Sequence, residues 1–374
     1  MKQLNLFAPM CKTGYGVHAI NFLAGLYKEG YGVSVFPVGG VDYDGKYKKI
    51  VLDSISRGDK FDPNIPSIKL WHDTEMATFC GKPRIAYTVF ELDRLSTRGI
   101  HHLRSCDRIL VVSKWAKVVL INNGLKEDTI DVVPEGVDNI LFPYEKIKYD
   151  EKFGKNSPLV VCNIGKFEKR KGHYAILDAL RNTTMYIDIY AHWFNPFIDK
   201  NGILKAIEEN GWTNTYEPVS VSDHKFATFT NANGTVNLML SLDPIHDQKT
   251  ISNVYRSSHI GLFPHFGEGW NLPLIEAMAC GLPCITQNYS GPSEYLTTEN
   301  HINLPGTMKL AYDGIWFHKQ GNWSEVTPEE IANKLWIAYN NRELLSKINN
   351  ELKDFGEKWK WEQAVQKFSQ LEIV

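Results

Sequence analysis

Short β-rich apolar runs alternate along this chain with longer segments that have the periodicity of a helix. Such alternation implies right-handed strand–helix–strand units and parallel sheets. The expected strands form two series, and a charged segment interrupted by glycine and proline, Pro143–Pro158, separates them. The first series is expected at Gln3–Ala8, Val33–Val38, Ser67–Trp71, Arg84–Val89, Arg108–Val112 and Ile130–Val133. The second is expected at Pro158–Ile164, Met185–Ala191, Val236–Leu242, His259–Pro264 and Pro283–Thr286.

A chain of 374 residues is long enough for about two domains, each with its own core. We therefore expect an α/β protein in which two Rossmann-like domains with parallel sheets face each other across a cleft. The first domain is expected over residues 1–145, the linker over 146–157 and the second domain over 158–355. Residues 356–374 are expected to end the chain in a helix, whose apolar face carries Trp359, Trp361, Val365 and Phe368.

The composition narrows the function classes. Lysine and arginine number 41 against 43 acidic residues, which gives a net charge of -2. This balance disfavours a binder of nucleic acid or membranes that relies on charge, although a local basic patch stays open. The longest apolar runs reach only about four to six residues, whereas a bilayer span needs roughly 20. With no export signal visible and six scattered cysteines that read as reduced thiols, we expect a cytoplasmic protein.

Ligands of open α/β sheets bind beyond the carboxyl ends of the strands, so the loops there carry the chemistry. In the most informative loop, a strand is expected to end near Pro264 and a helix to begin near Leu272. Free backbone N–H groups and the helix dipole make this turn an anion site suited to phosphate. The turn comprises Gly269, Trp270, Asn271 and Leu272. Glu268 and Glu276 flank it and could accept hydrogen bonds from hexose and ribose hydroxyls, or could merely be solvated and complement the helix dipole.

This segment, GEGWNLPLIEAMACGLPCI, resembles the signature of glycosyltransferase family 4. That family comprises retaining, nucleotide-sugar-dependent enzymes of the GT-B fold. The resemblance implies that Glu268 contacts the donor sugar, that Glu276 binds the ribose hydroxyls, and that the amides between them meet sugar and phosphate. At Trp270 the family usually carries a smaller aromatic residue followed by glycine, and Asn271 takes the place of that glycine.

A second loop is basic. Lys166, Lys169, Arg170 and Lys171 follow an expected strand, and Gly172 precedes the next helix. Such cations can neutralise a diphosphate leaving group, or can simply form a solvated loop. The loop resembles the family motif in which an arginine and a lysine bind the diphosphate. Lys166 stands at the arginine position, where a lysine loses the bidentate geometry, and Lys171 stands at the lysine position.

A third loop contains Gly14 and Gly16 in the pattern G-x-G-x-x-A. A dinucleotide fingerprint needs its glycines directly after the strand and an acid after the second strand, whereas Pro9–Thr13 intervene here and the acid is missing. A nicotinamide-dependent oxidoreductase is therefore disfavoured. The resemblance implies instead a flexible loop through which the backbone approaches the donor phosphates and the acceptor, with Tyr15 on the acceptor side. The alternative is a plain loop that starts the following helix.

The fourth group of candidates follows two neighbouring strands. His72 follows one and Glu91 the next, within the sequence FELDR. In the family a histidine at the first position lies over the reacting sugar, so His72 is a catalytic candidate, although a lone histidine is more often structural. Glu91 is interpreted as acceptor-binding or as a base, and Asp93 and Arg94 are expected on the acceptor side.

The resemblance extends over most of the chain, and residues 192–250 are its least typical part. It implies that Ser290, Gly291 and Glu294 lie near the nucleotide and that the terminal helix, with WKWEQAVQKF, packs back on the first domain. The D-x-D triplet at Asp42–Asp44 lies in a loop of the wrong architecture for a metal site. We therefore expect no metal and no cofactor.

The leading hypothesis is a retaining glycosyltransferase that moves a sugar from a nucleoside diphosphate sugar, with a UDP-sugar as the expected donor. The acceptor is a hydroxyl, expected on a glycan or glycoconjugate. Three alternatives remain open: the same transfer to a hydroxylated nucleic-acid base, a GT-B-like epimerase or phosphorylase, and a non-catalytic sugar-nucleotide sensor. Nucleic acid is not the expected partner, but the sequence does not exclude it.

Overall fold

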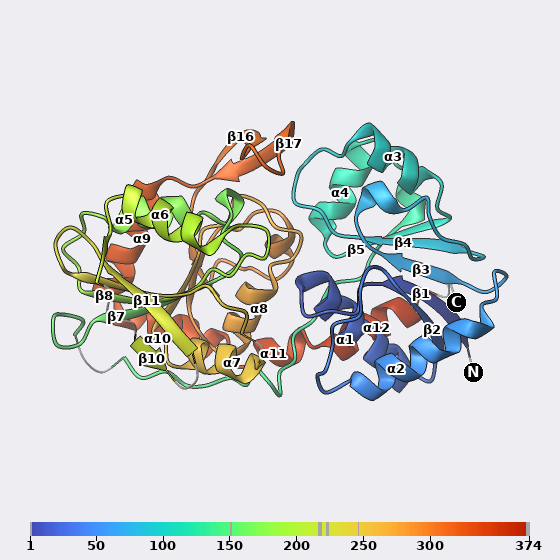
Figure 1. Ribbon diagram of the computed structural model, residues 1–374, viewed down its shortest axis with the longest axis horizontal. Coiled ribbons are helices and arrows are strands. Elements are labelled where there is room, and N and C mark those ends of the chain that lie inside the picture. Colours follow the sequence, from blue (N-terminus) through green and yellow to red (C-terminus); the bar gives the residue numbers. More distant parts are fainter. Residues whose placement is uncertain (1, 150–151, 216–218, 222–223, 246, 372–374) are drawn as a thin grey trace.

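The computed structural model describes residues 2–149, 152–215, 219–221, 224–245 and 247–371, and it has two α/β lobes (Figure 1). Residues 150–151 of the expected linker, 372–374 of the expected terminal helix, and 216–218, 222–223 and 246 of the atypical region lie outside the described residues. None of the helices within those ranges combines the length and apolar character that a membrane crossing requires.

The first lobe is a six-stranded parallel sheet in the order β2-β1-β3-β4-β5-β6. The strands are β1 (Gln3–Ala8), β2 (Gly32–Pro37), β3 (Ser67–Leu70), β4 (Arg84–Thr88), β5 (Arg108–Val111) and β6 (Ile130–Val132). Helices α1 (Gly14–Lys28) and α2 (Lys48–Ser56) lie on one face, and α3 (Thr97–Arg104) and α4 (Lys114–Asn122) on the other (Figure 1). Short 3-10 helices occupy Arg57–Lys60, Asp73–Glu75 and Glu127–Thr129. The strand order reverses between β1 and β3, which makes the loops after these strands the switch point of this sheet.

The second lobe contains the parallel strand order β12-β8-β7-β13-β14-β15, which is the doubly wound Rossmann order 3-2-1-4-5-6. These strands are β7 (Leu159–Ile164), β8 (Ile187–His192), β12 (Val236–Ser241), β13 (Ile260–Phe263), β14 (Cys284–Thr286) and β15 (Ile302–Asn303). Its helices include α5 (His173–Leu180), α6 (Lys200–Glu209), α7 (Gln248–Arg256) and α8 (Leu272–Ala279), with 3-10 turns at Lys169–Lys171 and Gly291–Glu294. The order reverses between β7 and β13, so the loops after these two strands diverge at a second switch point.

Parallel strands are buried on both faces, and therefore they read as continuous apolar runs. All four residues of β13 are buried, and so are five of the six residues of β7. This is why the eleven strands expected from apolar runs are confirmed within one or two residues at each end.

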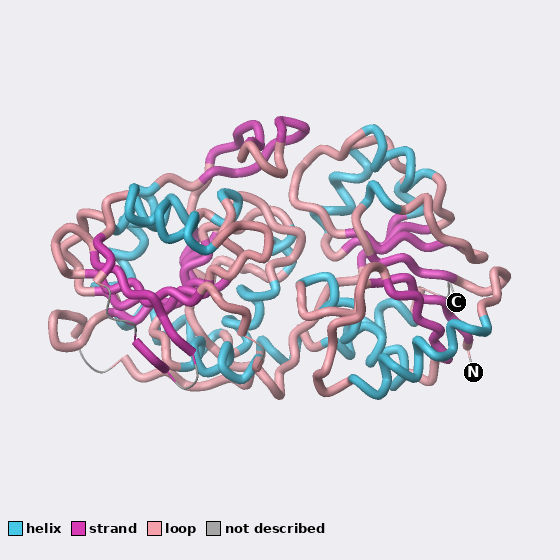
Figure 2. The backbone as a smooth tube through the Cα atoms, viewed as in Figure 1, coloured by secondary structure: helices cyan, strands magenta, loops and turns pink. Residues whose placement is uncertain are grey.

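Two antiparallel additions were not predicted. One extends the second sheet beyond β12 through β9 (Thr213–Asn214), β10 (Val219–Val221) and β11 (His224–Thr230). The other is a separate hairpin, β16 (Thr307–Tyr312) with β17 (His318–Glu325), which projects from the second lobe at the top of Figure 2. Most residues of β16 are exposed, so no apolar run marks it in the sequence.

The chain ends in α9 (Pro328–Asn340), α10 (Arg342–Glu351), α11 (Phe355–Lys358) and α12 (Trp361–Ser369). Helix α12 packs on α1 of the first lobe, where the rings of Phe368 and Phe22 lie 5.3 Å apart. The main-chain N–H of Val137 also donates to the carbonyl of Trp359 at 2.8 Å. The expected return of the terminal helix to the first domain is therefore confirmed.

Candidate active site

The two loops that diverge at the second switch point meet around the carboxylate of Glu268. Its Oε1 lies 2.6 Å from Nζ of Lys171, and its Oε2 lies 2.7 Å from Nη1 of Arg170. Burial alone would raise the pKa of Glu268, but the charges of Arg170 and Lys171 outweigh it and hold the pKa well below its ordinary value. The main-chain N–H of Glu268 donates to Oγ of Ser290 at 2.9 Å, which fixes the turn. Glu268 is thus a buried, charged and firmly held carboxylate.

The basic loop after β7 does not present its cations equally. Nζ of Lys166 lies 3.0 Å from Oε1 of Glu168, and about half of the Lys166 side chain is exposed. Arg170 is buried, and it contacts Oε2 of Glu168 at 3.1 Å as well as Glu268. The guanidinium beside Glu268 therefore belongs to Arg170, which the sequence pattern marks only as one member of the basic loop.

Helix α8 begins at Leu272, four residues after Glu268. Asn271, its N-cap, has a φ of 73° in the left-handed region, which explains why glycine is usual at this position and shows how asparagine replaces it. Pro273 lies in the first helical turn, where main-chain N–H groups have no partner within the helix, so the N–H that proline lacks costs no hydrogen bond. The N–H groups of this turn lie at the carboxyl edge of the sheet, as an anion site requires.

Gly269 and Trp270 also have structural roles, in addition to the backbone N–H groups that they contribute to the turn. A Cβ on Gly269 would collide with the side chain of Val89 from the first lobe, so only glycine fits there. The indole of Trp270 is buried between Tyr295 and Trp359, with ring centroids 5.0 and 5.7 Å away. Only the backbone of Trp270 is therefore offered to a ligand of the turn.

Glu276 lies one turn into α8 and receives a hydrogen bond from the hydroxyl of Tyr255 at 3.4 Å. Burial raises the pKa of Glu276 to about 8, and the nearby carboxylate of Glu135 adds to the shift. At neutral pH the ligand-free side chain is mostly a neutral acid. It can then both donate to and accept from hydroxyl groups, as a ribose would require.

The first switch point brings Tyr15 to His72. The hydroxyl of Tyr15 lies 3.2 Å from Nδ1 of His72 and donates to the carbonyl of Val89 at 2.9 Å. His72 itself is exposed at the end of β3. A Cβ on Gly16 would collide with the carbonyl of Cys11, which accounts for that glycine, whereas Gly14 has open space around it. The structure thus joins two of the predicted residues, Tyr15 and His72, in one group.

The residues after β4 contact the second lobe. Asp93 accepts hydrogen bonds from the main-chain N–H of Asn322 at 2.6 Å and from its Nδ2 at 3.0 Å, which ties the hairpin to the first lobe. The main-chain carbonyl of Glu91 lies against Gly267, where an added Cβ would approach it to 2.6 Å. Arg94 is exposed. The carboxylate of Asp93 is therefore occupied by the second lobe in this structure.

The loop after β14 supports the turn and also bridges the lobes. A Cβ on Gly291 would collide with the carbonyl of Gly269, and the N–H of Gly291 donates to the carbonyl of Glu268 at 2.9 Å. Glu294 accepts from the main-chain N–H of Lys114, the first residue of α4, at 2.7 Å. Ser290 and Gly291 thus hold the Glu268 turn, and Glu294 caps a helix of the other lobe.

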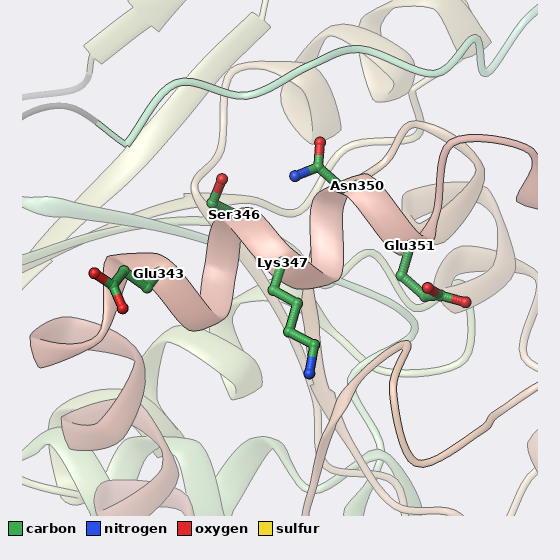
Figure 3. Close-up of a pocket in the computed structure, with 5 residues that line it drawn as sticks. All are labelled: Glu343, Ser346, Lys347, Asn350 and Glu351. Carbon is green, nitrogen blue, oxygen red and sulfur yellow. The ribbon is translucent and has the colours of Figure 1, made fainter.

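Two other features lie outside this site. Asp44 of the D-x-D triplet pairs with Lys12 at 2.9 Å, and no group of His, Cys, Asp or Glu among the described residues could hold a metal ion. A shallow pocket is lined by five side chains that all belong to α10 (Figure 3). Because one helix supplies the whole lining, this surface offers no converging groups and is no candidate active site.

The β13 loop of the second lobe lies against the residues that follow β4 of the first, at Val89 and Glu91. Two Rossmann-like lobes that face each other in this way form the GT-B architecture. A family model described as "Glycosyl transferases group 1" matches residues 231–311. An uncharacterized glycosyltransferase of Methanocaldococcus jannaschii is 25% identical over 260 residues, which cover 69% of this chain and 57% of the relative. The match thus spans little more than half of that relative's length.

Solved structures share the fold across the whole chain. HepE of Anabaena, solved in complex with UDP and glucose, is 12% identical with a TM-score of 0.66 over 99% of both chains. Sucrose-phosphate synthase of Thermosynechococcus elongatus is 14% identical with a TM-score of 0.67 over 99% of this chain and 98% of its own. The fold is GT-B, and the findings together support a glycosyltransferase similar to family 4.

Proposed function

We propose that this protein is a retaining glycosyltransferase that takes a sugar from a UDP-sugar and transfers it to a hydroxyl of a glycan or glycoconjugate. The observation that carries the proposal is the Glu268 cluster, in which a buried carboxylate and two cations lie at the N-terminus of α8. A site of this kind offers positive potential to a diphosphate and a fixed acceptor to a sugar hydroxyl. The choice of a uridine nucleotide rests on the fold shared with HepE, whose structures hold UDP and UDP-glucose.

The diphosphate is expected at the amides of Gly269–Leu272, with Lys171 and Lys166 beside it. As the bond between the anomeric carbon and the phosphate oxygen breaks, its electron pair passes to the diphosphate. The positive end of α8 and the two lysines stabilise that charge. No metal is part of this proposal, because side chains and a helix terminus supply the positive charge.

Glu268 and His72 orient the sugar in this scheme, and Glu276 binds the ribose hydroxyls. The acceptor approaches from the first lobe, past Tyr15, Glu91 and the loop of Asp93 and Arg94. Its hydroxyl oxygen bonds to the anomeric carbon on the face that the diphosphate leaves, and its proton passes to the leaving phosphate. The configuration at that carbon is thereby retained.

We place the reaction in the cytoplasm, where six free cysteines fit a reducing environment.

The variant Glu268→Ala tests the proposal. We expect it to lose transfer while UDP binds within about threefold of the wild type, because the carboxylate acts on the sugar rather than on the nucleotide. Glu351→Ala, at an exposed position of α10, is the matched control and should turn over normally. NMR of the product should show the anomeric configuration of the donor, and incubation with inorganic phosphate but without acceptor should leave the donor intact. Full turnover by Glu268→Ala, or epimerised or phosphorolysed donor, would contradict the proposal.

A further inference from the structure

Arg170 connects the two loops that diverge at the second switch point. Its Nη1 lies 2.7 Å from both the Glu268 carboxylate and the carbonyl of Gly267, and its Nη2 lies 3.1 Å from Glu168. Its own carbonyl accepts from the N–H of Phe266 at 2.7 Å. The guanidinium is buried, with 6% of the side chain exposed. Arg170 therefore has fixed partners on both sides of the site.

Lys171 also pairs with Glu268, but it has fewer partners than Arg170. Among the described residues its Nζ is paired with Oε1 of Glu268 alone, and its side chain is 14% exposed. A lysine ammonium is a point charge on a flexible stem, whereas a guanidinium binds through a rigid planar fork. When a diphosphate binds at the N-terminus of α8, Lys171 is therefore the cation whose side chain can move from Glu268 to the phosphates.

The charges of the cluster show which cation would remain beside Glu268 after Lys171 moved to a diphosphate. Three cations, Lys166, Arg170 and Lys171, face two carboxylates, Glu168 and Glu268. Once Lys171 contacts the diphosphate, Arg170 is the cation that still contacts Glu268. A buried carboxylate without a positive partner takes up a proton. The protonated carboxyl group is then a weaker hydrogen-bond acceptor.

We propose that Arg170 is a positioning residue, which keeps the Glu268 carboxylate charged and in place while Lys171 leaves it for the diphosphate of a bound donor. This inference rests on the proposed function. It assigns Arg170 to the sugar half of the donor site, although Arg170 belongs to the basic loop that the resemblance connects with phosphate.

The other titratable groups around Glu268 cannot replace Arg170. His265 lies on the same loop as Glu268, and burial lowers its pKa to about 4, so the imidazole is neutral at pH 7. Burial raises the pKa of Tyr295 well above its ordinary value, so that hydroxyl is neutral as well. Glu91, from the first lobe, faces Arg170 and carries the wrong charge. Arg170 is thus the fixed positive charge among the described neighbours of Glu268.

The experiment compares Arg170→Met and Arg170→Lys with the wild type, using UDP affinity and the turnover of a UDP-sugar between pH 5 and 9. Arg84→Met is the matched control, because Arg84 also ties main-chain carbonyls, those of Ser105 and Met76, but in the first lobe. We expect Arg170→Met to bind UDP within about threefold of the wild type and to lose roughly 100-fold in turnover at pH 7. The loss should shrink as the pH rises and Glu268 regains its charge, which gives an acid limb that the wild type lacks.

Arg170→Lys keeps the charge, so its pH profile should keep the shape of the wild-type profile with a lower turnover number. A merely structural role of Arg170 would lower turnover equally at every pH, and that result would overturn the inference; Arg84→Met should keep the wild-type shape of the pH profile. A loss of UDP affinity as large as that of Lys171→Met would overturn it too, because Arg170 would then bind phosphate itself. If Arg170→Met does not fold, the double variant Glu168→Gln/Arg170→Gln removes both charges together and should show the same acid limb. Failure of the wild type to bind UDP or turn over a UDP-sugar would instead refute the proposed function.

Discussion

Replacement of Glu276 by glutamine should stabilise the ligand-free protein, and the gain should grow with pH. In the folded chain the pKa of Glu276 is raised from 4.5 to about 8 by burial. Between these two pH values the unfolded chain has lost the proton that the folded chain keeps, so the free energy of unfolding falls as the pH rises. At and above pH 8 the full shift corresponds to roughly 5 kcal/mol. Because Glu276 is partly exposed and water reaches it, we expect about 2 kcal/mol in practice.

Glutamine resembles the neutral acid in shape and hydrogen bonding but cannot ionise. Thermal unfolding of Glu276→Gln should therefore match the wild type near pH 4.5 and exceed it at pH 8 by roughly 4–8 °C, given 2–4 °C per kcal/mol for a domain of this size. UDP affinity should stay within about threefold of the wild type near pH 7, because the amide, like the neutral acid, both donates to and accepts from hydroxyl groups. An equal difference in melting temperature at both pH values, or a less stable variant at pH 8, would show that the reasoning about burial is wrong.

Three further substitutions test the arrangement around the turn. Gly269→Ala should force the lobes apart, because its Cβ would collide with Val89; small-angle scattering should show a larger radius of gyration, and unchanged scattering would refute the contact. Asn271→Gly should raise the melting temperature through a gain of about 0.5–1 kcal/mol, since its φ of 73° suits glycine, and a lower melting temperature would count against the strained cap. Asp93→Ala should release the hairpin, so amide exchange at Asn322 should accelerate severalfold; unaltered exchange would mean that this bond contributes nothing in solution.

The parts of the fold that could be predicted are those in which a local pattern determines the structure. Strands β7 and β13 are buried on both faces, so their apolar runs identify them. The start of α8 follows from Pro273 and the turn residues before it. Because parallel strands present their carboxyl ends at one edge, the approximate position of Glu268 beside the basic loop also follows from the sequence.

The remainder depends on contacts between distant segments. Four cations in one loop look alike in the sequence, and only the packing of the β13 loop shows that Arg170 points to Glu268. Asp93 binds Asn322 of a hairpin whose exposed strand carries no apolar signal. The raised pKa of Glu276 results from burial, and no motif encodes burial of a single carboxylate. The sequence therefore predicts which residues gather, but not how their charges are shared.

The central claim is that a nucleoside diphosphate binds at the N-terminus of α8, with Lys171 turned from Glu268 to its phosphates. A crystal structure of the protein with UDP tests this most directly. We expect the β-phosphate within hydrogen-bond distance of Nζ of Lys171 and of the amides at Gly269–Leu272, the ribose hydroxyls at Glu276, and Glu268 still paired with Arg170. UDP bound elsewhere, or Lys171 still on Glu268 with no phosphate near the amides, would contradict the account.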